Sequence, residues 1–401
     1  MEDRRVLTDR RRWKGATFIV VLFVALRLMM WMTFPADNLT LFGDYVYYYE
    51  LAAYSDHGDL PFIHYWSEYP PVFPFLSVGI YQLARLLGGG YHVYVGLMGL
   101  LMLGANAGNL VLFLRLARRL YGAEAAERRG WAYSVLFVPL MYTWWSFDAL
   151  TVLSLLLALE LLLEGRERWS AVAMGVGGLI KLVPLLMFPA VMRARPRRQW
   201  LIYGLVAAAV VGAVAVPLMV IGGPMAWASF RSPAGRSSWQ TVWALADGNL
   251  RTGLLGAAAD HFDLSLATDP VGNVSRIPEW LRLVVFGAVY AVMFWRVHLR
   301  DKPRRLISFV TLTLVVFFLW SKGWSPQWQT LLFPLLLLVL PLRRGVLFVL
   351  VLSFVNLAEW PVLLSRGLNE WLYVTVLVRT GLFLLLAVEL WMDIRRQASS
   401  V

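Results

Sequence analysis

The chain has 401 residues, of which 59% are hydrophobic, and its formal net charge is +12 at pH 7. Soluble domains average about 45–50% apolar residues, and many segments here approach the roughly 20 apolar residues that cross a bilayer. A soluble fold is therefore excluded, and the absence of cysteine excludes disulfides and thiolate chemistry. Cytoplasmic loops of a membrane protein account for the basic excess, so we expect no nucleic-acid partner.

The first apolar run, residues 15–34, follows "RRVLTDRRRWK" and lacks a small-residue cleavage site. It predicts a retained first span rather than a signal peptide. Residues 35–90 then form a predicted first outer segment. No Lys or Arg occurs from Leu28 to Ala84, a stretch that covers most of this segment. Within this segment, residues 71–87 are interrupted by prolines and predict a helix lying in the membrane interface.

Residues 170–192 have basic clusters at both ends, so one simple span would place a cluster outside the cytoplasm. We predict a broken-helix hairpin that turns near Lys181, because Pro184 disfavours a continuous helix. The other predicted spans are 91–114, 131–146, 148–164, 200–221, 279–299, 304–321, 328–342, 344–360 and 371–392.

These elements predict an all-α polytopic membrane protein with a single integral-membrane domain, residues 1–401. We expect about twelve crossings, with the hairpin counted as two and both termini in the cytoplasm. The outer segments 35–90 and 222–278 are too long to be mere connectors.

Asp44 opens "GDYVYYYELAAYSDHG", a predicted helix that stops at Gly58. Its position fits a helix N-cap, and it equally fits a general base held at the membrane surface. The tyrosines that follow, Tyr48 among them, fit an interfacial aromatic belt or a surface that stacks on a sugar ring.

Other polar residues of the predicted outer face have two interpretations each. Glu68, which precedes Tyr69 and a proline pair in "SEYPPVFPF", is an exposed loop carboxylate or orients an acceptor hydroxyl. Asp148 in "WWSFDAL" caps the following helix or binds substrate or a divalent cation. Gln327 in "SKGWSPQWQT" is a candidate sugar contact.

The candidate phosphate-binding cations begin with Lys181, which is the only ionisable residue of the apolar hairpin. A charge there costs several kcal/mol unless it is paired or wetted, and phosphate is its natural anion. Lys322 is an ordinary loop cation or a second phosphate contact. Arg231, Arg236 and Arg251 are solvated surface charges or phosphate clamps. Motifs of serine hydrolases, phosphate loops and zinc proteases are absent, so we expect no metal centre.

Three stretches in this order carry a resemblance to a known family: "GDYVYYYELAAYSDHGDLPFIHYWSEYPP", "FDALTVLSLLLALELLLEGRERWSAVAMGVGGLIKLVPLLMFPAV" and "SKGWSPQWQTLLFPLLLL". The chain resembles the GT-C superfamily of membrane glycosyltransferases, and most closely glycosyltransferase family 87. The resemblance implies a GT-C-like bundle with helical outer loops, in a prokaryotic plasma membrane.

The resemblance also implies a polyprenyl-phosphate sugar donor, a lipid-linked or glycan acceptor, an active site on the outer face and inversion at the anomeric carbon. A mannose-like hexose is the favoured sugar. The first-loop Asp of the family corresponds to Asp44, and Lys181 aligns by local context. Many relatives have two adjacent acids where this chain has "GD", so no metal cofactor is favoured, although a divalent cation stays open.

Three alternatives remain open on the sequence. A transporter or flippase of lipid-linked saccharides predicts internal repeats and charged residues along a path through the membrane. A ligase or polymerase of lipid-linked glycans would use the same kind of site, with carboxylates and cations on the outer face. A non-catalytic assembly protein would keep the fold without the chemistry.

Overall fold

The computed structural model describes residues 2–41, 43–136, 146–253, 256–268, 272–300 and 302–399. Over these ranges the chain is helical, and extended backbone pairs only at two isolated bridges, Pro61 with Tyr65 and Trp239 with Gly323. The predicted all-α class is confirmed.

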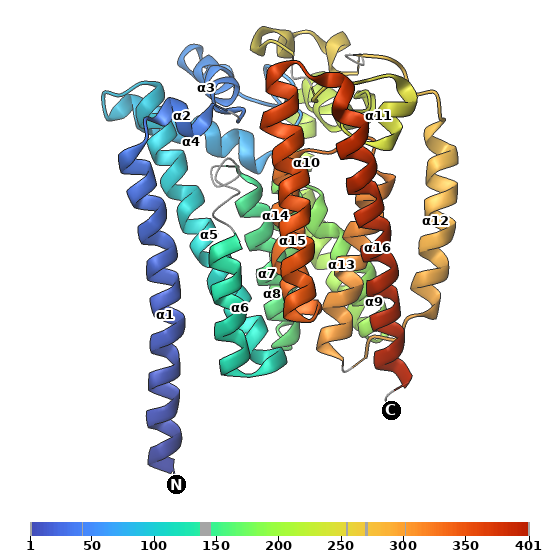
Figure 1. The fold of residues 1–401 in the computed structure, drawn as a ribbon. Helices are drawn as coiled ribbons and strands as arrows, with labels where there is room; N and C mark the ends of the chain where they lie inside the picture. Colours follow the sequence, from blue (N-terminus) through green and yellow to red (C-terminus); the bar gives the residue numbers. More distant parts are fainter. Residues whose placement is uncertain are drawn as a thin grey trace.

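The longer helices stand side by side as a bundle, and both chain ends lie at the same end of it (Figure 1). The bundle contains α1 (Glu2–Thr33), α5 (Tyr91–Tyr121), α6 (Ala123–Leu136), α7 (Asp148–Leu163), α8 (Glu167–Ile180), α9 (Phe188–Ala194), α10 (Arg197–Gly235), α12 (Glu279–Arg296), α13 (Pro303–Trp320), α14 (Gln329–Val339), α15 (Leu342–Leu357) and α16 (Leu372–Ser399).

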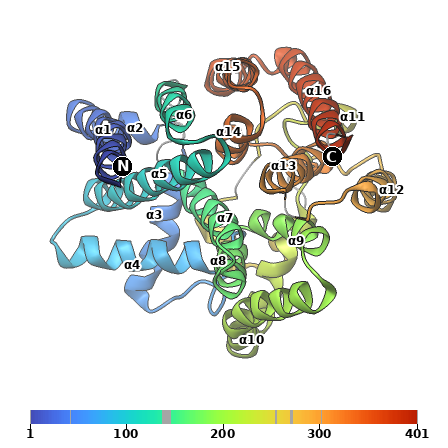
Figure 2. The ribbon, with the colours of Figure 1, turned by 90° about the horizontal axis from the view of Figure 1, so that it is seen from below.

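Helix α14 forms the centre of the bundle, where it contacts α5, α6, α7, α13 and α15 (Figure 2). Each of its residues is buried. A helix that is apolar on all sides is stable only where other apolar surface covers it. The leucine-rich composition of this segment therefore makes it the core around which the other helices pack.

Six helices of the described chain are long and apolar enough to cross a membrane. They are Gly15–Thr33, Tyr91–Tyr121, Arg197–Gly235, Pro303–Trp320, Leu342–Arg366 and Asn369–Arg396. The chain is an integral membrane protein. The count of about twelve crossings is not confirmed, because several predicted spans form shorter helices. Most of the predicted span 131–146 lies outside the described residues.

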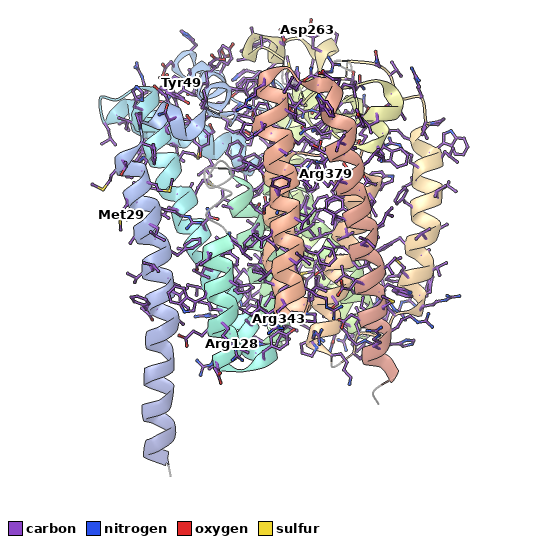
Figure 3. The ribbon with its side chains drawn as sticks, viewed as in Figure 1. Met29, Tyr49, Arg128, Asp263, Arg343 and Arg379 are labelled. Carbon is purple, nitrogen blue, oxygen red and sulfur yellow. The ribbon has the colours of Figure 1, made fainter. Side chains whose placement is uncertain are left out.

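The opposite end of the bundle from the termini carries short helices: α2 (Ala36–Thr40), α3 (Tyr45–Ala53), α4 (Val72–Leu86) and α11 (Val242–Asp247) (Figure 1). We call this end the loop end. Tyr49 and Asp263 lie there, whereas Arg128 and Arg343 lie at the end that holds the termini (Figure 3). From the positive-inside rule we expect that arginine-bearing end to face the cytoplasm.

Two helix breaks shape the loop end. Helix α8 ends at Ile180 and Lys181 is extended, after which a 3₁₀ turn (Val183–Met187) leads into α9. Helix α10 does not end at residue 221 as the predicted span does. It bends at Gly223, where φ is 50°, and continues to Gly235. At Gly222 a Cβ atom would lie 1.9 Å from the Phe62 carbonyl oxygen, so only glycine permits this contact between α10 and the first outer segment.

A buried ion pair fastens the second outer segment to the bundle. Arg379 of α16 donates to Glu359 at 2.6 Å, and Gln240 donates to the other carboxylate oxygen at 2.8 Å. Arg379 also donates to the Gln240 carbonyl. All three side chains are buried, so each needs these partners. The segment before α11 is thereby held against α15 and α16.

The orientation can be tested directly, because a chain without cysteine needs no prior substitutions. His57 is exposed and ends the turn that follows α3 at the loop end. Arg128 is exposed at the arginine-bearing end (Figure 3). We expect a membrane-impermeant maleimide to label His57→Cys in intact cells, and Arg128→Cys only after permeabilisation. The reverse pattern would invert the orientation.

Candidate active site

Asp44 lies directly before α3, but its side chain makes no capping hydrogen bond. Asp44 therefore occupies the N-cap position, as predicted, but its carboxylate does not cap the helix. One carboxylate oxygen accepts the Tyr48 hydroxyl at 3.2 Å. Burial raises the pKa of Asp44, while Tyr48 and the positive charges of Arg236 and Lys181 lower it. Asp148 raises it further. Burial is the largest of these effects, so the pKa is above its ordinary value.

Aromatic rings surround the Tyr48 side chain. Its ring centroid lies 4.8 Å from that of Phe73, 5.9 Å from Tyr69 and 6.1 Å from Phe147. The Tyr48 hydroxyl is 3.5 Å from that of Tyr69. Burial raises the pKa of both tyrosines well above the ordinary value. Both hydroxyls therefore stay neutral, and the single hydrogen of Tyr48 is donated to Asp44, which leaves the Tyr69 hydroxyl as the donor beside this pair.

Lys181 and Asp148, for which the sequence predicts separate roles, form one ion pair. The Lys181 ammonium lies 2.6 Å from Asp148 Oδ1, and the Ser146 hydroxyl donates to Oδ2 at 2.9 Å. Side-chain exposure is 13% for Lys181 and 1% for Asp148. The alternative that Asp148 caps α7 is wrong, because its carboxylate binds Lys181 and Ser146 instead.

Two aromatic rings also face the Lys181 ammonium. Its nitrogen lies 4.9 Å from the centroid of Trp328 and 5.4 Å from that of Phe147. Both distances fall within the range of cation–π attraction. An ammonium carries three hydrogens, and Asp148 takes one, so the group can bind a further anion without leaving its partner.

Glu68 is not an exposed loop carboxylate, because only 7% of the residue is accessible. It forms an ion pair with Arg236 at the end of α10. Its other oxygen, Oε1, is buried and has no hydrogen-bond partner among the described residues. Arg236 also acts on the charge of Asp44. Of the three candidate arginines Arg231, Arg236 and Arg251, Arg236 is therefore the one described as acting on the acidic cluster, by which we mean Asp44, Glu68 and Asp148 with their cations Lys181 and Arg236.

The remaining candidates make other contacts. The Lys322 ammonium donates to Glu279 at 2.9 Å and to the Ala234 carbonyl at 2.7 Å. Arg231 is exposed, 5.9 Å from the Trp227 ring. Arg251 and Gln327 lie in the connections after α11 and before α14. The contacts described for these four residues involve none of Asp44, Asp148 and Lys181.

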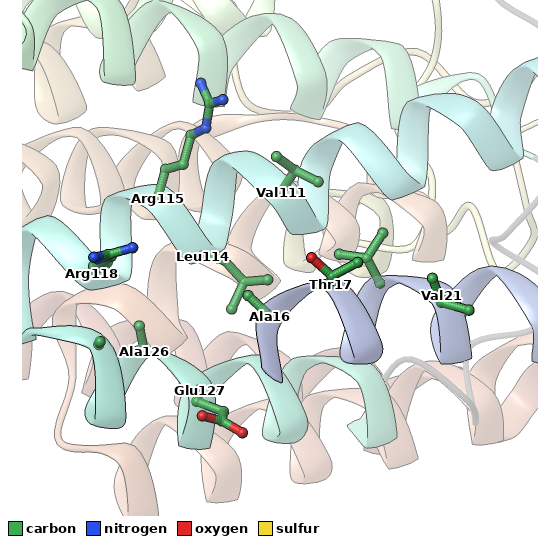
Figure 4. Close-up of a pocket in the computed structure, with 11 residues that line it drawn as sticks. Ala16, Thr17, Val21, Val111, Leu114, Arg115, Arg118, Ala126 and Glu127 are labelled. Atoms are coloured by element: carbon green, nitrogen blue, oxygen red, sulfur yellow. The ribbon is translucent and has the colours of Figure 1, made fainter. Parts of the chain in front are cut away.

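Within the ranges that the structure describes, no three His, Asp or Glu side chains are grouped so that they could hold a metal ion. A cavity of about 240 Å³ lies elsewhere, between α1, α5 and α6 (Figure 4). Its wall is mainly apolar, with Arg115, Arg118 and Glu127 along it. None of the predicted site residues lines it, so it is separate from the acidic cluster.

An all-helical membrane protein with carboxylates and cations gathered at one end fits the membrane glycosyltransferases. The sequence profile of glycosyltransferase family 87 matches residues 65–322, which is more than half of the chain. The chain belongs to this family, and the resemblance seen in the sequence is confirmed. Membership implies a lipid-linked sugar donor and an acceptor in the membrane.

Among solved structures, the chain is similar to the crystal structure of ArnT from Cupriavidus metallidurans in the apo state. The TM-score is 0.44 at 18% sequence identity, over 94% of this chain and 78% of that one. No curated protein matches the chain.

The ion pair of Lys181 and Asp148 can be dissected by a double-mutant cycle. Lys181→Met leaves a buried carboxylate unpaired, and we expect it to lower the free energy of unfolding by about 3–5 kcal/mol. Asp148→Asn combined with Lys181→Met removes both charges and should recover most of that loss. Unfolding of the solubilised protein measures both.

Arg128→Met is the matched control, because it breaks an exposed pair with Glu124 and should cost at most about 1 kcal/mol. An equal cost for Lys181→Met and Arg128→Met would show that burial does not govern the pair.

Proposed function

We propose that the protein is an inverting glycosyltransferase. It moves a mannose-like hexose from a polyprenyl-phosphate donor to a lipid-linked or glycan acceptor on the outer face of the membrane. The observation that carries this proposal is that Arg236, Asp148 and Lys181 all lie close enough to Asp44 to act on its charge, and that Lys181 and Asp148 form a buried ion pair.

In the proposed reaction, Asp44 accepts the proton of an acceptor hydroxyl while that oxygen bonds to the anomeric carbon. The bond from this carbon to the donor phosphate breaks, and its electron pair leaves with the phosphate. A single displacement inverts the carbon, through a transition state with oxocarbenium character as in glycoside hydrolysis. The isoprenoid chain of the donor stays in the lipid beside the bundle.

Asp44 suits the role of base because a general base works best with a pKa near the operating pH. Burial shifts its pKa in that direction. The neighbouring Tyr69 hydroxyl is a neutral donor, so it can hold a sugar oxygen without taking the proton that Asp44 accepts.

Charge balance favours Lys181 as the phosphate partner. The cluster of Asp44, Glu68, Asp148, Lys181 and Arg236 has three carboxylates and two cations, so its formal charge is −1 when Asp44 is ionised. When Asp44 takes the proton, the leaving phosphate gains one negative charge. The charge therefore moves from Asp44 toward the cation, where electrostatic stabilisation lowers the barrier.

The base assignment is tested by Asp44→Asn, which preserves shape and removes the proton acceptor. We expect transfer of radiolabelled sugar from polyprenyl-phosphate donors, measured in membranes, to fall by about 10²–10⁴-fold, the usual contribution of general base catalysis. Donor binding should persist. Equal transfer by Asp44→Asn and the unaltered protein would refute Asp44 as the base.

The pH dependence follows from the raised pKa of Asp44. Because the base must be ionised, kcat/KM should fall with decreasing pH at a midpoint above the usual aspartate pKa of about 3.9. Arg236 lowers the pKa of Asp44, so Arg236→Gln should move the midpoint to higher pH. Arg344→Gln, at an exposed arginine paired with Glu389, is the control and should leave the midpoint unchanged. A shift to lower pH in Arg236→Gln would contradict the assignment.

A further inference from the structure

A second cavity, of about 100 Å³, lies at the loop end, between the first outer segment and the residues after α10. It is large enough to hold several water molecules. Its walls include Tyr47, Trp66, Glu68, Arg236, Trp239 and Asp260. We infer that this cavity is the acceptor subsite and binds a neutral sugar ring of the acceptor. This inference rests on the proposed glycosyltransferase function.

The unpartnered oxygen of Glu68 is the first reason. A buried carboxylate oxygen without a hydrogen bond costs free energy, and such an atom in a cavity wall calls for a donor from a ligand. Glu68 is 7% accessible, and its Oε1 has no partner among the described residues, while the other oxygen binds Arg236. A sugar hydroxyl supplies the missing donor.

Tyr47 provides a second acceptor, through a network that includes His261. His261 Nδ1 lies 2.6 Å from the Trp66 carbonyl, which can only accept, so Nδ1 carries the hydrogen. Burial lowers the pKa of His261 to about 4, which keeps the ring neutral. Its Nε2 then accepts the Tyr47 hydroxyl. The Tyr47 oxygen retains lone pairs for a ligand donor.

The aromatic walls complete the match to a sugar. The Trp66 ring stacks on His261 with centroids 3.9 Å apart, and Trp239 lies beside Arg236 at 5.9 Å. An indole ring offers a flat apolar surface with a polar edge, which suits the C–H face of a pyranose. Glu68 and Asp260 disfavour a phosphate here, and Arg236 disfavours a cation. A neutral polyhydroxyl ligand fits this set best.

The cavity adjoins the proposed reaction centre along two paths. The Tyr47 ring is 6.1 Å from that of Tyr48, which donates to Asp44. The Trp239 ring is 6.3 Å from that of Trp328, which faces the Lys181 ammonium at 4.9 Å. A sugar in the cavity can therefore present a hydroxyl toward Asp44 while Lys181 engages the donor phosphate.

Direct binding tests the inference without turnover. The protein is placed in lipid nanodiscs, purified without glycoside detergents, and mixed with the methyl glycosides of mannose, glucose, galactose and arabinofuranose. We expect saturation-transfer NMR to detect ring protons of at least one of them. Trp239→Ala and Glu68→Gln should each weaken that binding about tenfold, the effect of losing one good contact to a charged or aromatic group.

Two controls make each result decisive. Trp280→Ala, at an exposed tryptophan of α12, should bind as the unaltered protein does. The Trp239 ring also packs against Trp328, so its removal can disturb the fold. Glu68→Gln keeps the side-chain shape and therefore tests the cavity independently. Unfolding curves confirm that each variant is folded.

Absence of binding by all four glycosides would overturn the acceptor subsite, and so would binding by folded Glu68→Gln and Trp239→Ala that equals binding by the unaltered protein. Binding that depends on both residues, in a protein that transfers no sugar from any polyprenyl-phosphate donor, would instead overturn the proposed function and leave a saccharide site.

Discussion

The burial of charge at the loop end is the constraint on which the arrangement of the site depends. Lys181 and Asp148 are both largely shielded from solvent, and two charges in a low-dielectric interior persist only when each has its partner in good geometry. Their 2.6 Å contact joins the break after α8 to the first turn of α7. The break is thereby held where Phe147 and Trp328 face the ammonium.

A second buried ion pair, Arg379 with Glu359, holds the wall of the proposed acceptor cavity in place. Glu359 binds Arg379 and Gln240, so the residues just after α10 cannot leave the bundle without exposing an unpaired charge. Trp239 precedes Gln240, and its backbone hydrogen-bonds with Lys322 and Trp324. The cavity wall is therefore fixed by contacts outside the cavity itself, which pre-organises it for a ligand.

Local sequence patterns predicted the helical class, the helix after Asp44 and the break at Lys181, because apolar length, turn residues and proline act over a few positions. They did not predict the burial of Glu68. Its partner Arg236 lies 168 residues further along the chain, and no periodicity reports a pairing across that separation. The capping interpretation of Asp148 failed for the same reason, since Lys181 competes for the carboxylate only after α7 and α8 pack together.

The stretch from Leu28 to Ala84 contains no Lys or Arg, and this explains why its carboxylates need cations from other helices. The positive-inside rule predicts such a lack in an outer segment, and between Leu28 and Ala84 the chain offers Asp44 and Glu68 no cation. The compensating charges come from α8 and α10, as Lys181 and Arg236. Asp44 and Glu68 are therefore neutralised only when distant helices pack against the first outer segment. The acidic cluster therefore forms only in the folded protein, once α8 and α10 have packed against the first outer segment.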